Sequence, residues 1–371
     1  MKEQFQRKDA KTQRREKTLR ADDVVARPEA LRRAWNFATL LDDSMRSTHF
    51  GVHGPFASLR LCVEKWVLSV FTIIFLLPGF AAAEDFPSEL VKFKQHGDKP
   101  VFTAAGPGTW EVKTRERGWI HLDPTSDGTD LAKPKYRLWY TGYDGTREGI
   151  KRLGYATSAD GIVWTRHKDN PIYDQHWVED MSIVPHNGVW HMFAEGKDDQ
   201  AQLLTSRDGV KWQRVGQLDV RKANGQPIEP GPYGTPTAWL EDGVWHLFYE
   251  RHDVGVWLAT SRDLKIFKNV SDEPVLRPGQ GIHDRDLIAM NQIVKHKGRY
   301  YAYYHGSAKG ETPSLWSTCV AVSDDLRSWK KYDNNPLLPR ELNRSSGIVI
   351  RDGEKIRLYT MHSEVWLHEG D

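Results

Sequence analysis

Four acidic residues in this 371-residue chain stand where an expected strand begins or ends, a placement that suits acid–base chemistry. Asp180 precedes the apolar stretch MSIV, and Glu116 lies between two arginines in TRERGW. Glu195 and Glu250 close the aromatic stretches VWHMFAE and VWHLFYE. A carboxylic acid that donates a proton and a carboxylate that activates water together make a hydrolytic site. We therefore predict that these four residues are catalytic.

Aromatic and cationic residues accompany these acids and would contact a substrate. The flat apolar faces that sugar rings pack on would come from Trp110, Trp119, Trp177, Tyr233 and Trp257. Paired carboxylates among such rings suit the cleavage of a glycosidic bond. We expect the sugar-binding set to be Arg115, Arg117, Tyr233, Arg251, Asp286, Asn291, His305 and His362. Because arginine forks bind planar anions well, this set favours an acidic sugar.

Every candidate also has a structural explanation, which stays open at this point. Asp180 could cap the start of a strand by accepting hydrogen bonds from backbone N–H groups. Glu195 and Glu250 could pair with buried arginines, and Glu116 could belong to a solvated cluster of salt bridges. The two histidines could lie in the interior with satisfied hydrogen bonds. The chain has no short His or Cys spacing of the kind that binds zinc, so we expect neither a metal nor a cofactor.

A phrase that occurs four times indicates what holds these residues in place. Each copy has Ser, then Asp two residues later, then an aromatic residue, as in Ser206, Asp208 and Trp212. The copies span residues 153–164, 203–212, 257–267 and 319–329. A strand-rich repeat of roughly 50–60 residues is typical of propeller blades. Because every copy carries the same groups, we expect the Asp to cap a turn and the aromatic ring to pack between blades.

Aromatic-rich strands predict the number of blades. One precedes each repeated phrase, and a fifth lies near the C-terminus, so the predicted fold is an all-β, five-bladed propeller of four-stranded antiparallel blades. Tight turns that suit positive φ occur at Asn187-Gly188, Asp242-Gly243, Lys297-Gly298 and Asp352-Gly353. The predicted blades lie near residues 110–170, 178–220, 234–275, 287–337 and 344–370. We expect residues 86–104 to supply the strand that the fifth blade lacks, which removes an open edge.

Alignment of the blades places the candidates at one face of the ring. The innermost strands bring together Asp180, Thr235, Met290 and Ser345, with Glu116 nearest in the first blade. The ends of the second strands carry Asp144, Glu195, Glu250, His305 and His362. The loop that enters the fourth blade adds Asp284, Asp286 and Asn291. We expect the chemistry at this face, because it is where the blades differ.

The residues ahead of the repeats predict export. An apolar run at 66–80 follows Arg60 and Lys65 and precedes three alanines, which is the pattern of a signal peptide. The predicted division is a disordered or wrongly assigned extension at 1–57, a signal peptide at 58–83, and a secreted or periplasmic propeller at 84–371. The run is shorter than the ~20 residues of a membrane span, although a signal anchor stays open. A formal net charge of only +2 predicts no nucleic-acid partner.

The chain resembles the five-bladed propeller glycosidases of glycoside hydrolase families 43, 32, 117 and 130, in particular their secreted bacterial members. The resemblance covers roughly residues 100–365. It rests on the repeated ATS-x-DG phrase, the turn Asn170-Pro171-Ile172, its echo Asn335-Pro336-Leu337 and the VED segment at 178–180. The resemblance implies a propeller that acts on carbohydrate.

The resemblance also implies roles for particular residues. Families 130 and 32 carry an acidic segment before a proline in blade 2, and Glu179-Asp180 matches it except that Met181 replaces the proline. Asp180 would then be the proton donor or a stabiliser of the transition state. Glu116 would be the base or nucleophile, with Glu111 as its rival.

One segment departs from the family 43 pattern. Where those enzymes carry an acid, this chain has GPYGTP at 231–236, without a carboxylate. Glu195, Glu250 or His362 would then supply the acid. We expect an exo-acting glycoside hydrolase. Two alternatives stay open, a glycoside phosphorylase in which phosphate replaces water and a propeller that binds glycans without catalysis.

Overall fold

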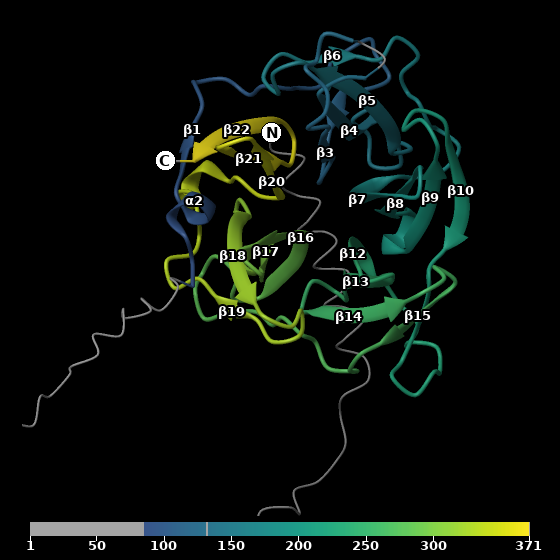
Figure 1. Ribbon diagram of the computed structural model, residues 1–371, viewed down its shortest axis with the longest axis vertical. Coiled ribbons are helices and arrows are strands. Elements are labelled where there is room, and N and C mark those ends of the chain that lie inside the picture. Colours follow the sequence, from purple (N-terminus) through teal and green to yellow (C-terminus); the bar gives the residue numbers. More distant parts are fainter. Residues whose placement is uncertain (1–84, 131–132, 371) are drawn as a thin grey trace, which may run out of the picture. The chain divides into compact units, whose positions relative to one another are not determined.

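The computed structural model describes residues 85–130 and 133–370, which form a five-bladed β-propeller of antiparallel blades (Figure 1). The predicted fold class is therefore confirmed. The predicted extension at 1–57 and signal peptide at 58–83 lie outside the described residues. Within the described part of the chain, no helix is long and apolar enough to cross a membrane.

The first three blades follow the order of the chain. Blade 1 contains β2 (Lys113–Thr114), β3 (Trp119–Leu122), β4 (Tyr136–Tyr143), β5 (Arg152–Ser158) and β6 (Thr165–Arg166). Blade 2 contains β7 (Glu179–His186), β8 (Val189–Glu195), β9 (Ala201–Ser206) and β10 (Trp212–Gln217). Blade 3 contains β12 (Gly234–Glu241), β13 (Val244–Glu250), β14 (Val256–Ser261) and β15 (Ile266–Asn269), with β11 (Asp219–Arg221) parallel to β15. Blades 1 and 3 thus have five strands each instead of the expected four.

The last two blades have four strands each. Blade 4 contains β16 (Leu287–His296), β17 (Arg299–Ser307), β18 (Ser317–Ser323) and β19 (Lys330–Lys331). Blade 5 contains β20 (Gly347–Asp352), β21 (Lys355–Met361), β22 (Val365–Gly370) and β1 (Phe93–Gln95), which follows the short helix α2 (Ser88–Val91). Because β1 pairs antiparallel with β22, the N-terminal strand closes the ring as expected (Figure 1).

The innermost strands line the centre of the ring. β3, β7, β12, β16 and β20 each contact the next one, and β20 contacts β3. β7, β12 and β16 bulge near their starts. Positive φ angles occur at this level at Glu116, Asp180, Thr235 and Ser346. Bulges and left-handed residues re-aim side chains next to functional sites. In blade 5 the aligned position is thus Ser346, one residue beyond the expected Ser345.

The repeated phrase has the structural role that its repetition predicted. In blade 2, Asp208 Oδ1 accepts hydrogen bonds from the backbone N–H groups of Val210 and Lys211. The neighbouring blade uses the same turn, because Trp139 Nε1 donates to the carbonyl oxygen of Gly209 at 2.7 Å. Trp212 packs edge-on against Trp139, with ring centroids 6.3 Å apart. The turn therefore joins blade 1 to blade 2.

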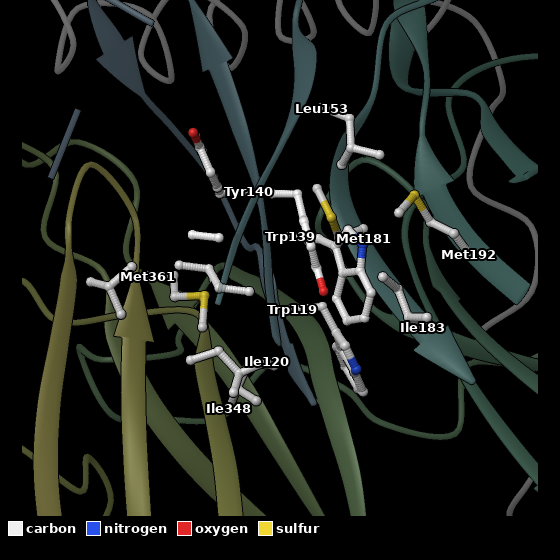
Figure 2. Close-up of a cluster of buried hydrophobic side chains, with 14 of the residues drawn as sticks. Trp119, Ile120, Trp139, Tyr140, Leu153, Met181, Ile183, Met192, Ile348 and Met361 are labelled. Atoms are coloured by element: carbon white, nitrogen blue, oxygen red, sulfur yellow. The ribbon is translucent and has the colours of Figure 1, made fainter. Parts of the chain in front are cut away.

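Buried apolar side chains fill the space between blades (Figure 2). Trp119, Met181, Ile348 and Met361 come from blades 1, 2 and 5 and belong to one cluster. Full burial of each such side chain contributes about 1.5–3 kcal/mol. A Cβ on Gly118 would lie 2.5 Å from the carbonyl oxygen of Trp139, so only glycine fits where the chain enters β3. This close packing fixes the strand starts that carry the candidate residues.

Candidate functional site

Five carboxylates from the first three blades gather at the face where the innermost strands begin. We call Glu116, Glu179, Asp180, Glu195 and Glu250 the acidic ring. Their exposed fractions lie between 2% and 8%. Antiparallel pairing aligns Glu179 with Glu195 in blade 2 and Gly234 with Glu250 in blade 3. The structure thus brings together the four carboxylates that we expected to be catalytic, and it adds Glu179.

Arg115 links two members of the acidic ring. Its Nη2 donates a hydrogen bond to Glu116 Oε1 at 2.7 Å, and its Nε lies 2.7 Å from Glu179 Oε2. Burial by itself would lower the pKa of Arg115, but Glu179, Glu116 and Asp180 outweigh that effect and raise it. A permanent cation at this distance attracts the Glu116 carboxylate and fixes its orientation. Because Arg115 already serves two carboxylates, it is poorly suited to the anionic sugar that we expected it to bind.

Arg117 is a structural hub, which corrects the expectation that it binds sugar. Its side chain is fully buried, and Nη1 donates to Thr237 Oγ1 at 2.7 Å and to the carbonyl oxygens of Met290 and Asn291. Nη2 donates to the carbonyl oxygens of Asp180 and Pro236 at 2.6 and 2.7 Å. Burial lowers the pKa of Arg117 to about 10, although Asp180 and Glu195 act in the opposite direction. One guanidinium thus ties four blades together and leaves neither terminal nitrogen for a ligand.

A buried lysine supports the acidic ring from behind. Trp177 Nε1 donates to Glu179 Oε1 at 2.8 Å. Lys151 Nζ lies 4.1 Å from the centroid of the Trp177 ring and 4.3 Å from that of Tyr143, and its side chain has no exposed surface. Cation–π contacts of this kind fix the indole and thereby orient Glu179. Sequence reasoning missed Lys151, because a lysine ahead of a strand gives no sign that it will be enclosed by aromatic rings.

Backbone N–H groups of blade 3 hold the other two glutamates. Thr235 N donates to Glu195 Oε2 at 3.0 Å, and Asp253 N donates to Glu250 Oε2 at 2.5 Å. Glu195 belongs to blade 2, so its carboxylate reaches across to the neighbouring blade. Both side chains are 2% exposed. Backbone N–H groups therefore orient both glutamates. The alternative in which they pair only with buried arginines does not account for these donors.

The predicted polar ligands of blades 4 and 5 differ in how far they are exposed to solvent. His362 Nδ1 is 3.9 Å from Glu116 Oε2, and its side chain is 28% exposed, so it borders the acidic ring. In blade 4, Asn291 Nδ2 lies 2.9 Å from His305 Nδ1, and both residues are buried. The His305 ring packs edge-on against Trp316. His362 thus has the accessibility that a sugar ligand needs, whereas His305 and Asn291 form an interior pair.

Three predicted ligands have their polar groups engaged elsewhere. Tyr233 is buried, and its hydroxyl donates to the carbonyl oxygen of Leu218 at 2.8 Å, which corrects the expectation that it packs on sugar. Arg251 Nη2 donates to two carbonyl oxygens of the preceding loop at an exposed position. Asp286 accepts a hydrogen bond from Lys309 N at 2.9 Å. None of these hydrogen bonds involves a carboxylate of the acidic ring.

Two other acidic candidates lie on the flanks of blades. Glu111 contacts Arg166 of β6, and Asp284 Oδ2 accepts a hydrogen bond from Lys331 Nζ of β19 at 2.6 Å. We call Glu111–Arg166 and Asp284–Lys331 the flank pairs. Both acids are at most 1% exposed. Because each carboxylate meets a cation of an outermost strand, Glu111 does not replace Glu116 as the acid of blade 1.

A cavity lies at the opposite end of the innermost strands. Its volume is about 380 Å³, and all five blades contribute to its wall. The wall is mainly apolar, as Ile120, Ile183, Leu240, Ile293 and Ile350 illustrate. None of the acidic-ring carboxylates lines it. We therefore place the candidate chemistry at the acidic ring and not in this cavity, because it lacks a carboxylate pair.

Comparisons with known proteins agree with this architecture. No family model matches the chain. The chain is 25% identical over 276 residues to the 1,2-β-oligomannan phosphorylase of Thermoanaerobacter sp. (strain X514), a match that covers 68% of this chain and 84% of that protein. The expected resemblance is confirmed.

Two solved structures share the fold at low sequence identity. A candidate glycoside hydrolase from Parabacteroides distasonis ATCC 8503 superposes with a TM-score of 0.61 at 18% identity, over 76% of this chain and 97% of that one. The second comes from work on GH130 glycoside hydrolases that target β-1,2-mannosidic linkages in Candida mannan. Its TM-score is 0.54 at 19% identity, over 75% of this chain and 93% of that one. At these identities, the likeness shows a common propeller.

Proposed function

We propose that the chain is an exported, exo-acting glycoside hydrolase. The observation that carries this proposal is the acidic ring, in which five buried carboxylates from three blades gather and Arg115 contacts two of them. Burying like charges together costs free energy, so packing alone does not favour such a cluster. Clusters of this kind are instead typical of sites that move protons.

The roles follow from the contacts of each carboxylate. Glu116 is oriented by Arg115 at 2.7 Å, and its carboxylate is suited to take a proton from water. Asp180 occupies the position of the proton donor or transition-state stabiliser in the resembling families. Glu195 belongs to the same blade as Asp180, and Glu250 belongs to the next blade. A donor and a base on opposite sides of a glycosidic bond suffice for hydrolysis.

We propose β-1,2-linked mannosides as the substrate class. The name of the curated relative and the description of the GH130 structure both refer to this linkage. An uncharged sugar also suits the site better than the acidic sugar first expected. That expectation depended on accessible arginines, but Arg115 is paired with carboxylates and Arg117 is enclosed by backbone carbonyls.

A glycoside phosphorylase is the second candidate, because the curated relative is one. Phosphate is a polyanion and binds where arginine or lysine donors converge on it. Here the central arginines are engaged by protein, and the surrounding carboxylates repel an anion. Water is therefore the acceptor that the site favours.

The test is sugar release by the full chain from β-1,2-mannobiose, longer neutral glycans and acidic glycans, each with and without phosphate. We expect monosaccharide release without phosphate, and a fall of at least ~100-fold in Asp180→Asn. The matched control is Asp219→Asn, on the exposed edge strand β11. Strict dependence on phosphate would instead establish a phosphorylase. Saturable glycan binding without any product would establish a binding propeller.

A further inference from the structure

The cavity at the end opposite the acidic ring has walls from every blade. The innermost strands β3, β7, β12, β16 and β20 surround it (Figure 1). Each of them contributes a buried apolar side chain to its depth, namely Ile120, Ile183, Ala238, Ile293 and Val349. The volume of about 380 Å³ lies within the range of small-molecule sites, which is roughly 300–1,000 Å³. The cavity is therefore large enough for a small apolar molecule.

The Arg117 hub separates this cavity from the acidic ring. The guanidinium of Arg117 has no exposed surface and donates to backbone carbonyl oxygens of β7, β12 and β16. The cavity wall begins shortly beyond these carbonyls on the same three strands, at Ile183, Ala238 and Gln292. A molecule in the cavity therefore enters from the face opposite the acidic ring and does not compete with a sugar.

The side chains of the wall offer few polar groups to a ligand. Gln292 uses its amide on blade 5, because Nε2 donates to the carbonyl oxygen of Val349 at 3.0 Å and Oε1 accepts from Val349 N at 2.6 Å. Burial, and then Arg137, lower the pKa of His121 to about 4, so its imidazole is neutral near pH 7. Among the described residues that line the cavity, none is an aspartate or a glutamate. The wall therefore suits an apolar body without charge.

Arg351 gives the mouth of the cavity a permanent positive charge. This exposed residue lines the cavity, and its Nη2 lies 3.1 Å from His296 Nδ1. The nearby acids are engaged elsewhere, since Glu89 Oε1 lies 3.2 Å from His296 Nε2 and Asp352 Oδ2 lies 2.9 Å from Lys135 Nζ. In the part of the chain that the structure describes, no carboxylate lies within ion-pair distance of Arg351. Its guanidinium can therefore meet one anionic group of a ligand.

We propose that this cavity binds a small apolar molecule that carries a single carboxylate, such as a medium-chain alkanoate. The alkyl part lies between the innermost strands, where its removal from water drives binding. The carboxylate lies at the mouth and accepts hydrogen bonds from the guanidinium of Arg351. Because the site is separate from the acidic ring, this inference does not depend on the proposed hydrolase.

Calorimetric titration of the full chain with decanoate tests the site. We expect saturable binding of one decanoate per chain, with a negative change in heat capacity because apolar surface is buried. Decanol should bind about 3- to 10-fold more weakly, and decyltrimethylammonium more weakly still, because neither can pair with Arg351. Addition of β-1,2-mannobiose should leave the affinity for decanoate unchanged. The absence of saturable binding would overturn the proposal, and equal affinity for the alcohol would overturn the role of Arg351.

Two pairs of variants locate the ligand in the cavity. Leu240→Glu puts a carboxylate into the wall and should weaken decanoate binding at least ~10-fold, whereas Leu240→Met should keep it. Arg351→Gln should abolish the preference for decanoate over decanol. The matched control is Lys297→Gln, an exposed cation next to His296 that does not line the cavity and should retain the preference.

Each result of these variants decides one part of the proposal. Wild-type affinity in Leu240→Glu would place the ligand outside the cavity. If Leu240→Glu does not fold, the exposed Arg351→Gln still decides, because an unchanged preference for decanoate would overturn the assigned site. Light scattering with and without decanoate adds a further check. A dimer that decanoate dissociates would show that a second copy of the chain fills the cavity, which would overturn the small-molecule occupant.

Discussion

The acidic ring and the flank pairs differ in how each buried carboxylate is compensated. In a flank pair, one acid meets one cation of an outermost strand, as Asp284 meets Lys331. In the acidic ring, five acids gather, but Arg115 contacts only two of them and Arg117 donates mainly to backbone carbonyls. Burial of a carboxylate therefore does not by itself identify a catalytic group. The concentration of like charge is the more informative feature.

Blade 1 contains both arrangements within one short segment. Glu111 contacts Arg166 of β6 and is 1% exposed. Glu116 is bound by Arg115 and lies 3.9 Å from the partly exposed His362. The first contact stabilises the edge of a blade, and the second leaves a base next to an accessible ligand. This contrast provides matched variants for tests of function and stability.

The largest effect should come from Glu116→Gln compared with Glu111→Gln. Loss of the base should lower kcat by about 10²–10⁴-fold and remove the low-pH limb of its profile. Glu111→Gln should leave kcat unchanged and lower the free energy of unfolding. Steady-state kinetics across pH and urea unfolding would measure both. Equal loss of kcat in the two variants would break the distinction within blade 1.

Arg117→Met should produce the largest loss of stability. It leaves five acceptors in three other blades without their donor, so the free energy of unfolding should fall by about 3–5 kcal/mol. Chemical denaturation is the measurement, with Arg251→Met on an exposed loop as the control. A loss no larger than that of the control would show that the hub does not hold the ring together.

The apolar cavity at the other end of the strands predicts an acid-sensitive stability. Burial, and then Arg137, lower the pKa of His121 to about 4. Below the ordinary histidine pKa of about 6.5, His121 binds a proton in the unfolded chain but not in the folded protein. This residue should therefore remove up to about 3 kcal/mol of stability as the pH falls from 6.5 towards 4. Urea unfolding of His121→Gln should show a shallower fall over this range, and an unchanged slope would contradict the assignment.

Asp284→Asn tests whether a flank pair is purely structural. The substitution leaves Lys331 without its carboxylate and weakens the hydrogen bond from Tyr304, which is 2.9 Å long. We expect the free energy of unfolding to fall by about 1–3 kcal/mol, with kcat unchanged. Thermal unfolding would measure the loss of stability. An activity assay at a temperature at which the variant is fully folded would measure kcat. A specific loss of kcat would place Asp284 with the acidic ring instead.

The smallest effect concerns the repeated turns. Asp208→Ala removes a carboxylate that accepts two backbone N–H hydrogen bonds at an exposed turn. We expect a loss of about 1 kcal/mol in the free energy of unfolding, and no change in activity. The other copies of the phrase provide equivalent variants, such as Asp325→Ala. A loss of activity with intact folding would mean that the repeat does more than cap turns.

The architecture could be predicted because it repeats. Four copies of one phrase and a fifth aromatic strand give the number of blades, and β1 pairs with β22 where a strand was missing. Alignment on the turns also predicted that Asp180 and Thr235 occupy equivalent positions in their blades, because antiparallel pairing fixes the register of the strands. In blade 5 the positive φ falls on Ser346 and not on the expected Ser345, a difference of one residue that leaves no mark in the sequence.

The partners of the charged residues could not be predicted in the same way. Arg115 and Arg117 are two positions apart, yet one binds carboxylates and the other binds carbonyl oxygens of three other blades. These contacts join residues far apart in the chain, so spacing carries no information about them. Tyr233 has the aromatic ring expected of a residue that packs on sugar, but its hydroxyl donates a buried hydrogen bond to the carbonyl oxygen of Leu218.

The most direct test of the account is a parallel measurement of turnover and unfolding free energy for Asp180→Asn and Asp284→Asn. On β-1,2-mannobiose, Asp180→Asn should lose at least ~100-fold in turnover while its stability stays near that of the wild type or rises, because one of several like charges is removed. Asp284→Asn should keep its turnover and lose stability. The reverse pattern, or equal effects on both quantities, would contradict the division between a catalytic ring and structural flanks.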